Sequence, residues 1–372
     1  MTNPTTPRPV RGLPPLHLAV ALDGAGWHPA AWRAEGARPG ELFTAGYWAD
    51  LVTEAERGLL DLVTFEDALA LQSVSLSGPD DRTDQVRGRL DAVLIASRVA
   101  PLTSRIGLVP TTNVTHTEPL HLAATLATLD RAALGRAGWR PQVSARADDA
   151  AHFGRPAPAT LGEGDLASPE TISGRLAPLF DDAAEVVAAV ARLWDGHRTA
   201  LPVTVLAHAR IPYELAAKGG DVAYVTPYSP DGVAAVLTEV AAAATAVDRP
   251  AERPLKVFAD LLVLLDERPG EAARHKDRLD ELAGAPLRSD AEIFAGTPAE
   301  LADLLLDWRA VDADGQRLDG FRLRPARLPH DLLAITRSLV PELQRRGAFR
   351  TTYEATTLHG HLGLPAPAGP RT

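Results

Sequence analysis

RIGLVPTTNVTHTEPLHLAATLATLDRAALGRAGWRPQVSAR, residues 105–146, reads as a strand, a helix and a second strand. The apolar run Ile106–Val109 predicts the first strand, and Pro119 suits the first turn of a helix that carries an apolar stripe. The turn sequence GRAG then leads into a second predicted strand, Trp139–Ser144. This order predicts a right-handed crossover in a parallel sheet. Such sheets bind ligands at the carboxyl ends of their strands, where this chain has a polar cluster from residue 111 onward.

The same alternation extends outward over most of the chain. Helical patterns separate eight apolar stretches, which are the predicted strands: 16–22, 59–65, 106–109, 139–144, 201–207, 222–225, 255–265 and 320–323. Eight alternating units predict an α/β fold, a (β/α)8 TIM barrel with loop insertions. A doubly wound open sheet is the alternative, but no Gly-rich dinucleotide fingerprint follows the first strand.

The predicted barrel occupies residues 16–350 as a single domain. Residues 1–15, rich in Pro and Thr, are expected to be a disordered leader, and residues 351–372 a C-terminal tail. The polar segments 72–86 and 147–174 are expected to be long loops. Helices are predicted from Leu179 to Trp194, after the second loop, and from Asp331 to Arg346, as the last helix of the chain.

Composition excludes several classes of function. The net charge of −10 argues against nucleic-acid binding, which needs clustered Lys and Arg. The absence of cysteine excludes disulfides and thiolate chemistry. His116 and His121 have poor spacing for a shared metal, so no metal site is expected. The chain lacks a signal peptide and any run of about 18 apolar residues, which predicts a cytoplasmic protein without a membrane span.

Position at the predicted strand ends nominates the residues for chemistry. They are Asp23, Glu66, Asp67, Thr111, Thr112, Asn113, His116, Ser144, Arg146, His208, Arg210 and Arg324. Asp67 could bind a ligand or cap a helix, and the Thr111–Thr115 stretch could line a pocket or form a turn. No nucleophile elbow or Gly-rich phosphate loop is present. The residues alone therefore predict a barrel with a polar pocket of unspecified chemistry.

Several stretches together resemble the bacterial luciferase-like flavin monooxygenases, in the branch of nitrilotriacetate monooxygenase, dibenzothiophene-sulfone monooxygenase and pristinamycin synthase. They include GAGWHPAAWR at 24–33, ERGLLDLVTFED at 56–67, residues 105–139, GTPAELADLLLDW at 296–308 and VPELQRRGAFRTTYEATTLHGHLGL at 340–364. The resemblance implies a TIM barrel of the luciferase-like type, usually dimeric. It implies a two-component monooxygenase that receives reduced FMN (FMNH2) from a separate NAD(P)H:flavin reductase and uses O2, through a flavin C4a-peroxide, to oxidise a small organic substrate.

The resemblance also implies roles for particular residues. Asp67, Thr111, Asn113 and Ser144 would lie in the flavin pocket. The histidines His28, on the first loop, and His116 are the candidate catalytic residues.

The chain departs from the family pattern at the chemical edge of the site. Arg140 replaces an Asn that usually follows GRAGW, and Leu179-Phe180 replace an Arg and a Tyr that approach the flavin. The family's Gly-Ser-Ser phosphate turn is Ala207-His208-Ala209 here, so His208 and Arg210 are expected to bind the phosphate by charge. The alternatives are a degenerate barrel that binds flavin weakly or not at all and serves as a partner subunit or binding protein, and a barrel that uses a deazaflavin.

Overall fold

The computed structural model describes residues 14–72, 81–156, 169–195 and 200–365. The predicted leader therefore lies outside the described residues except for Pro14 and Pro15, and so do the last seven residues of the predicted tail. Side chains are described from Gly174 onward in the third of these segments.

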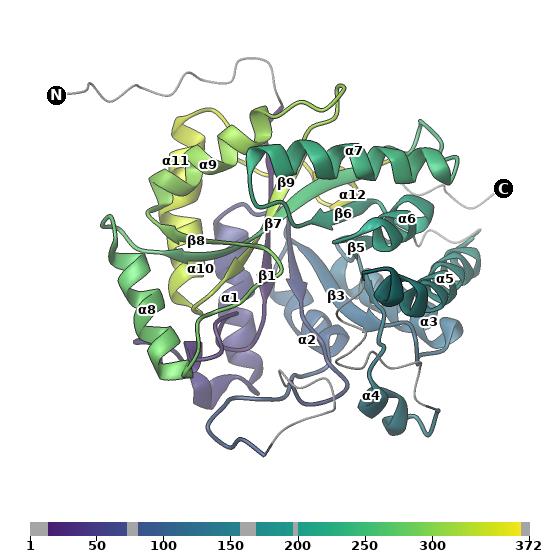
Figure 1. Ribbon diagram of the computed structural model, residues 1–372, viewed down its shortest axis with the longest axis horizontal. Helices are drawn as coiled ribbons and strands as arrows, with labels where there is room; N and C mark the ends of the chain where they lie inside the picture. Colours follow the sequence, from purple (N-terminus) through teal and green to yellow (C-terminus); the bar gives the residue numbers. More distant parts are fainter. Residues whose placement is uncertain (1–13, 73–80, 157–168, 196–199, 366–372) are drawn as a thin grey trace.

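Eight parallel strands form a nearly closed barrel, which confirms the predicted fold (Figure 1). They run in the order β4-β3-β2-β1-β9-β7-β6-β5, and a bridge between Trp139 and Val203 joins the two ends of this series. Their bounds are β1 His17–Leu22, β2 Leu62–Phe65, β3 Gly107–Asn113, β4 Arg140–Gln142, β5 Thr204–Leu206, β6 Val222–Val225, β7 Lys256–Leu265 and β9 Gly320–Pro325.

A ninth strand, β8 (Glu292–Gly296), was not predicted. The first half of β7 pairs with β6 over Lys256–Ala259, and the same edge then pairs with β8 over Leu261–Leu265. β8 therefore lies outside the barrel, next to α8 (Glu271–Ala283), as Figure 1 shows. The strand is short and mostly half-buried, so it lacks the apolar run that reveals the other strands.

Helices surround the barrel, as the alternation predicts (Figure 1). The remaining ones are α1 Ala45–Arg57, α2 Ala92–Val99, α3 Pro119–Ala133, α4 Ala147–His152, α5 Pro169–Trp194, α6 Arg210–Gly219, α7 Pro230–Ala246, α9 Pro298–Ala310, α10 His330–Ala334, α11 Val340–Arg345 and α12 Leu358–Leu362. The short 3-10 turns are Ala31–Arg33, Pro39–Glu41 and Ala100–Leu102.

Two helical predictions differ from the structure. The segment 147–174 is not all loop, because it holds α4 and the first turns of α5, which begins at Pro169 rather than at Leu179. The single helix expected near residues 331–346 is instead α10, a π turn over Ile335–Leu339, and α11. Pro341 has no N–H to donate, which favours a wider turn just before it.

The strands divide the apolar core into two parts, because successive side chains point alternately to the surrounding helices and to the inside of the barrel. Leu18 and Val20 belong to the main core, whereas Ala19 belongs to a second apolar cluster. That second cluster consists of Ala19, Leu62, Val109, Val222, Tyr224, Phe258, Leu358 and Leu362. The last two come from α12, so this helix closes the apolar layer inside the barrel. Toward the carboxyl ends of the strands, the interior becomes ionic.

Candidate active site

A buried carboxylate between two guanidinium groups forms the centre of the ionic layer. Arg322 and Arg324 of β9 lie on the same face of their strand, and Asp260 of β7 pairs with Arg322 in the sheet register. Arg322 Nε and Nη2 donate to the Asp260 carboxylate at 2.8 and 2.5 Å, and Arg324 Nε donates at 2.9 Å. Burial alone would raise the pKa of Asp260, but the two arginines outweigh it and lower this pKa to about 2. All three groups are therefore charged near neutral pH.

The ionic layer continues across the barrel to β2 and β4. Arg140 forms an ion pair with Glu66, and its Nε donates to the Thr111 hydroxyl at 3.1 Å. Glu66 also lies 3.5 Å from Arg322. Burial opposes ionisation of Glu66, yet Arg140 and Arg322 hold its pKa below the ordinary value. A connected set of charges thus spans the barrel interior.

A histidine at the end of β5 completes the other side of the layer. His208 Nδ1 lies 3.1 Å from an Asp290 oxygen, and Arg324 Nη1 donates to the second Asp290 oxygen at 2.6 Å. Burial lowers the pKa of His208, so the ring is neutral near pH 7. The carboxylate favours the proton on Nδ1, which makes Nε2 a hydrogen-bond acceptor. Nε2 is buried and has no partner among the described residues.

Unpaired polar groups also gather at the end of β3. Asn113 Oδ1 accepts from the backbone N–H of His116 at 2.9 Å, but the Asn113 amide nitrogen has no described partner. The Thr112 hydroxyl and both ring nitrogens of His116 are also without described partners, and the His116 ring stacks on Phe153 at 5.5 Å. Buried polar groups rarely remain unpaired because each costs about 1–3 kcal/mol. The end of β3 is therefore a place where a polar ligand would be stabilised.

Ser144 and Asp67, which were predicted to lie in the flavin pocket, form hydrogen bonds within the protein. Ser144 Oγ donates to Asp149 at 2.6 Å. Asp67 accepts from the backbone N–H groups of Ala68 and Ala92, and Ala92 is the first residue of α2. Asp67 thus binds the N–H of the first residue of α2, whereas the N-cap of this helix is Asp91. Burial raises the pKa of Asp67.

His28 and Arg210 lie apart from this group. The His28 side chain is fully buried, with Nε2 3.0 Å from Asp280 of α8 and Nδ1 accepting from the Ala30 N–H. The Arg210 side chain is 84% exposed and pairs with Glu214 on the same helix. The structure thus connects Thr111 to His208 through the ionic layer, with Asn113 and His116 just beyond Thr111, whereas His28 and Arg210 face other partners.

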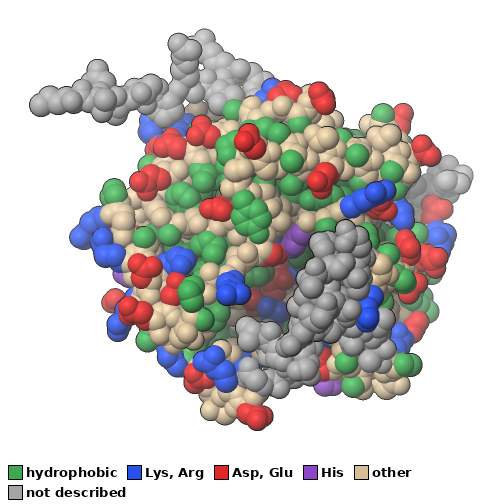
Figure 2. All heavy atoms as spheres, viewed as in Figure 1, with side chains coloured by type: hydrophobic (Ala, Val, Ile, Leu, Met, Phe, Trp, Pro, Cys, Tyr) green, Lys and Arg blue, Asp and Glu red, His purple; other side chains and the backbone are tan. Residues whose placement is uncertain are grey.

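Sequence reasoning did not nominate Asp260, Asp290, Arg140 or Arg322 for the site, although it noted Arg140 as a departure. The sequence feature that could have identified Asp260 and Arg322 is a charged residue inside an apolar strand, as in FADLLVLL and GFRLRP. Figure 2 shows a hollow near the centre of the molecule with acidic, basic and histidine side chains visible in its depth.

Among the described residues, no cluster of three or more His, Asp or Glu side chains has a geometry that could hold a metal ion. Within the same residues, no helix is both long and apolar enough to span a membrane.

Comparison with known proteins relates the whole chain to one family. Residues 25–316 match the family model for luciferase-like monooxygenases. The chain is 26% identical to nitrilotriacetate monooxygenase component A of Aminobacter aminovorans and 25% identical to N-acetyl-S-(2-succino)cysteine monooxygenase of Bacillus subtilis, covering 95% of this chain and 97% of each relative. The fold is similar to that of EDTA monooxygenase from Chelativorans, with a TM-score of 0.76, 20% identity, and coverage of 96% of this chain and 100% of that one. Since the family model matches most of the chain, this protein belongs to the luciferase-like monooxygenase family.

Proposed function

We propose that this chain is the oxygenase of a two-component monooxygenase, which takes reduced FMN from a separate NAD(P)H:flavin reductase and oxidises a small organic substrate with O2. Family membership supports the reaction class. The relative whose name contains "component A" supports a system with more than one protein. The proposal requires a compartment that contains NAD(P)H, which favours the cytoplasm.

The observation that carries the proposal is the set of unpaired polar atoms at the carboxyl end of the barrel. Asn113 offers an amide donor, Thr112 a hydroxyl, and His116 and His208 ring nitrogens. Since the ionic layer below them is internally paired, these neutral groups are the ones free to bind a ligand. They fit the polar edge of a flavin ring, which carries both donors and acceptors. When bound, the reduced flavin would supply the electrons that activate O2.

Each side chain has a separate task in this proposal. Asn113, which lies on the same face of β3 as Thr111, would bind and orient the flavin ring through a hydrogen bond. His208 Nε2, held in place by Asp290, would accept a hydrogen bond, and His116, stacked on Phe153, would face the substrate. Ser144 and Asp67 would act by positioning the neighbouring backbone.

The phosphate role of His208 and Arg210 is a separate part of the proposal. The first turn of α6 begins after Ala209, and no side chain caps it, so its N–H groups are available to an anion. Phosphate binding would require Arg210 to leave Glu214, and the Asp290 carboxylate beside His208 would repel the phosphate. A role for His28 would likewise require it to leave Asp280.

Flavin titration tests the proposal directly. FMN and FMNH2 should bind at tens of micromolar or below, and the Asn113→Ala variant should bind both FMN and riboflavin about tenfold more weakly. If His208 and Arg210 hold the phosphate, changing both to Ala should weaken FMN binding and leave riboflavin binding unchanged, whereas equal losses would refute that role. Arg253→Ala, an exposed arginine elsewhere, serves as the control.

A second candidate function is supported by the Arg140–Glu66 pair, which places two charges at a position where the family usually carries Asn. In this alternative, the barrel does not oxidise a substrate and acts as a partner subunit or binding protein. No FMN or FMNH2 binding at about 50 µM would favour it over the first proposal. Binding of a deazaflavin without binding of FMN would instead indicate the deazaflavin alternative. Oxygen consumption that depends on both a reductase and a substrate would exclude the degenerate barrel.

We also propose that this chain forms a homodimer. Leu94 of α2 is 69% exposed and Leu120 of α3 is 68% exposed, and these two helices are neighbours. Exposed leucines on adjacent helices favour burial against another protein surface. Light scattering measures the mass directly, and Leu94→Lys should shift a dimer toward the monomer of 39.5 kDa.

A further inference from the structure

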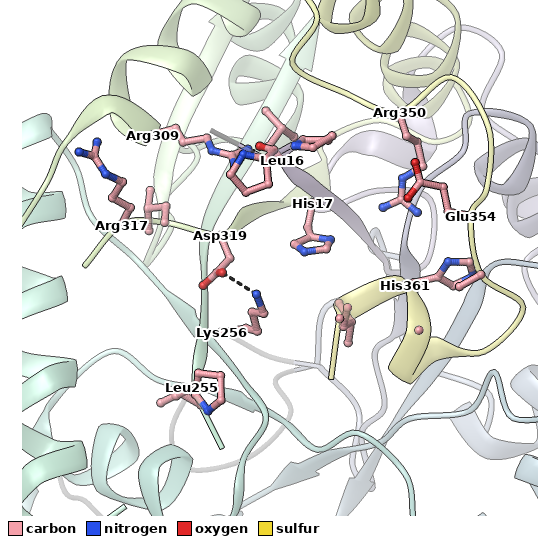
Figure 3. A pocket seen from close by; sticks show the side chains of 18 of the residues that line it. Leu16, His17, Leu255, Lys256, Arg309, Arg317, Asp319, Arg350, Glu354 and His361 are labelled. Carbon is pink, nitrogen blue, oxygen red and sulfur yellow. Dashed lines mark hydrogen bonds and ion pairs between the residues drawn. The ribbon is translucent and has the colours of Figure 1, made fainter. Parts of the chain in front are cut away.

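A cavity of about 520 Å³ lies at the opposite end of the barrel from the candidate active site (Figure 3). It opens at the amino ends of β1, β7 and β9, where His17, Lys256 and Asp319 line it. The last turn of α9 contributes Arg309, and α12 contributes His361. Its volume falls within the usual range for small-molecule sites.

Arg309 is the unusual residue of this cavity. It is only 7% exposed, and its single described hydrogen bond runs from Nη2 to the Pro14 carbonyl at 2.5 Å. No described residue forms an ion pair with it within 4 Å, and the charge of Asp319 acts on it only from further away. A buried guanidinium without a counterion is costly, because it has lost water without gaining a partner charge.

The other buried arginines show how this chain normally satisfies such a group. Arg136 donates to four oxygen acceptors, and Arg327 pairs with both Asp266 and Asp331. Arg140, Arg322 and Arg324 each pair with at least one carboxylate. Arg309 therefore differs from these other arginines, and the space beside it is the cavity.

Two further side chains face the same space, and one of them, Lys256, is a donor. Figure 3 shows the His17 ring and the Lys256 side chain directed toward the centre of the cavity, whereas Arg317 points away from it. His17 uses Nδ1 with Asp61 at 2.9 Å, and its Nε2 has no hydrogen bond to a described residue. Lys256 Nζ donates to Asp319 at 2.9 Å and has two further N–H bonds. His361, which is 6% exposed, has an unpaired Nδ1 among the described residues.

We propose that this cavity is a second binding site, which takes a small organic anion through a carboxylate or phosphate group held by Arg309, with Lys256 as an additional donor. The guanidinium supplies the planar pair of N–H groups that matches such an oxyanion. The ligand enters at the amino ends of the strands and occupies none of the groups proposed to bind flavin. The site is therefore independent of the proposed monooxygenase function.

Isothermal titration of the full chain with citrate and, separately, with inorganic phosphate tests the site at constant ionic strength, with chloride as the reference. Either anion is expected to bind with a Kd of about 1 mM or below. Arg309→Gln should weaken binding about tenfold or more, and Arg309→Lys, which keeps the charge but loses the planar fork, should weaken it less. Arg317→Gln is the matched control, because this residue lines the cavity but points toward Asp312.

The titrations distinguish which anion binds and whether Arg309 binds it. Preference for citrate or for phosphate identifies the oxyanion class. Binding of neither anion at about 10 mM would overturn the proposal, and so would equal affinity in Arg309→Gln and Arg317→Gln. If Arg309→Gln does not fold, Arg309→Lys carries the same comparison. Riboflavin binding should be unchanged in all three variants. A failure of the flavin proposal can therefore be distinguished from a failure of the anion-site proposal.

Discussion

Replacing Asp260 by Asn should destabilise the protein by about 3–5 kcal/mol, because it leaves two buried guanidinium groups without their shared carboxylate. Asp260 and Arg322 are fully buried and Arg324 is 2% exposed, so water does not replace the lost partner. The shift of the Asp260 pKa from 3.8 to about 2 corresponds to a stabilisation of the folded state by roughly 2–3 kcal/mol, which is of similar magnitude. Urea unfolding followed by circular dichroism at neutral pH measures the loss.

Asp303→Asn is the matched control for this prediction. Asp303 also pairs with an arginine, Arg346, at 2.5 Å, but its side chain is 52% exposed. Solvent screens such a pair, so the control should lose less than about 1 kcal/mol. A loss of the same small size in Asp260→Asn would show that the ionic layer does not stabilise the fold as a buried network.

The pH dependence of the same variant follows from the sign of the shift. The pKa of Asp260 is lower in the folded state than in the unfolded state, so its contribution is complete above about pH 4 and disappears as the pH falls through about 2. The stability difference between the parent protein and Asp260→Asn should therefore shrink between these pH values. A difference that stays constant down to pH 2 would contradict the assigned pKa.

Three further substitutions test how the scaffold is held, each by urea unfolding. Gly26→Ala should lower the free energy of unfolding by about 3 kcal/mol or more, because Gly26 has φ +126° and a Cβ there would lie 2.2 Å from the Ala326 carbonyl oxygen. Gly24→Ala is the control: a Cβ there would meet open space, so the loss should be about 1 kcal/mol. Thr297→Ala removes the capping box of α9 and should cost about 1 kcal/mol, while Thr297→Ser should cost little. Leu358→Ala should cost about 2–5 kcal/mol by leaving a void inside the barrel, and a loss below about 1 kcal/mol would show that α12 does not support the interior.

The sequence predicted the barrel because its strands are continuous apolar runs with polar ends. Barrel strands are covered on both faces, so β1 appears as a run of Leu, Val and Ala, and β7 as an apolar run interrupted only by Asp260. The same criterion missed β8, whose residues are mostly half-buried beside α8. It also placed the start of α5 ten residues late, since the polar first turns of that helix resemble a loop.

Only the structure explains why residues 107 and 138, in the 105–146 segment, are glycines. A Cβ at Gly107 would lie 2.6 Å from Leu358, and one at Gly138 would lie 2.8 Å from the same side chain. These positions make room for α12, which is more than two hundred residues further along the chain. A contact at this separation in sequence leaves no local pattern, so the sequence indicated only a turn at GRAG.

The candidate site was predicted in part for a similar reason. Polar positions at strand ends identified Thr111, Asn113, His116 and His208, because the barrel places all strand ends together. Which side chains these residues contact depends on the pairing register of the strands and on the insertions between them, and neither is visible in the sequence. Asp260 faces Arg322 only once β7 and β9 are known to be neighbours.

The insertion that holds α8 and β8 shows the same limit for two predicted site histidines, His28 and His208. α8 supplies Asp280, which binds His28. The loop before β8 supplies Asp290, which turns His208 toward the ionic layer. Neither partner is close in sequence to the residue it orients, so the orientation of both rings was beyond sequence reasoning.

The ionic layer also determines what kind of ligand the barrel mouth can bind. Arg140, Arg322 and Arg324 are matched inside the protein by Glu66, Asp260 and Asp290, so their charge is already neutralised. An incoming anion would have to displace one of these buried carboxylates, which costs several kcal/mol per pair. Among the side chains with unpaired buried atoms, Asn113, His116 and His208 are neutral near pH 7. The mouth is therefore suited to the neutral polar edge of a ring system, whereas the guanidinium of Arg309, which has no carboxylate partner, lies at the other end of the barrel.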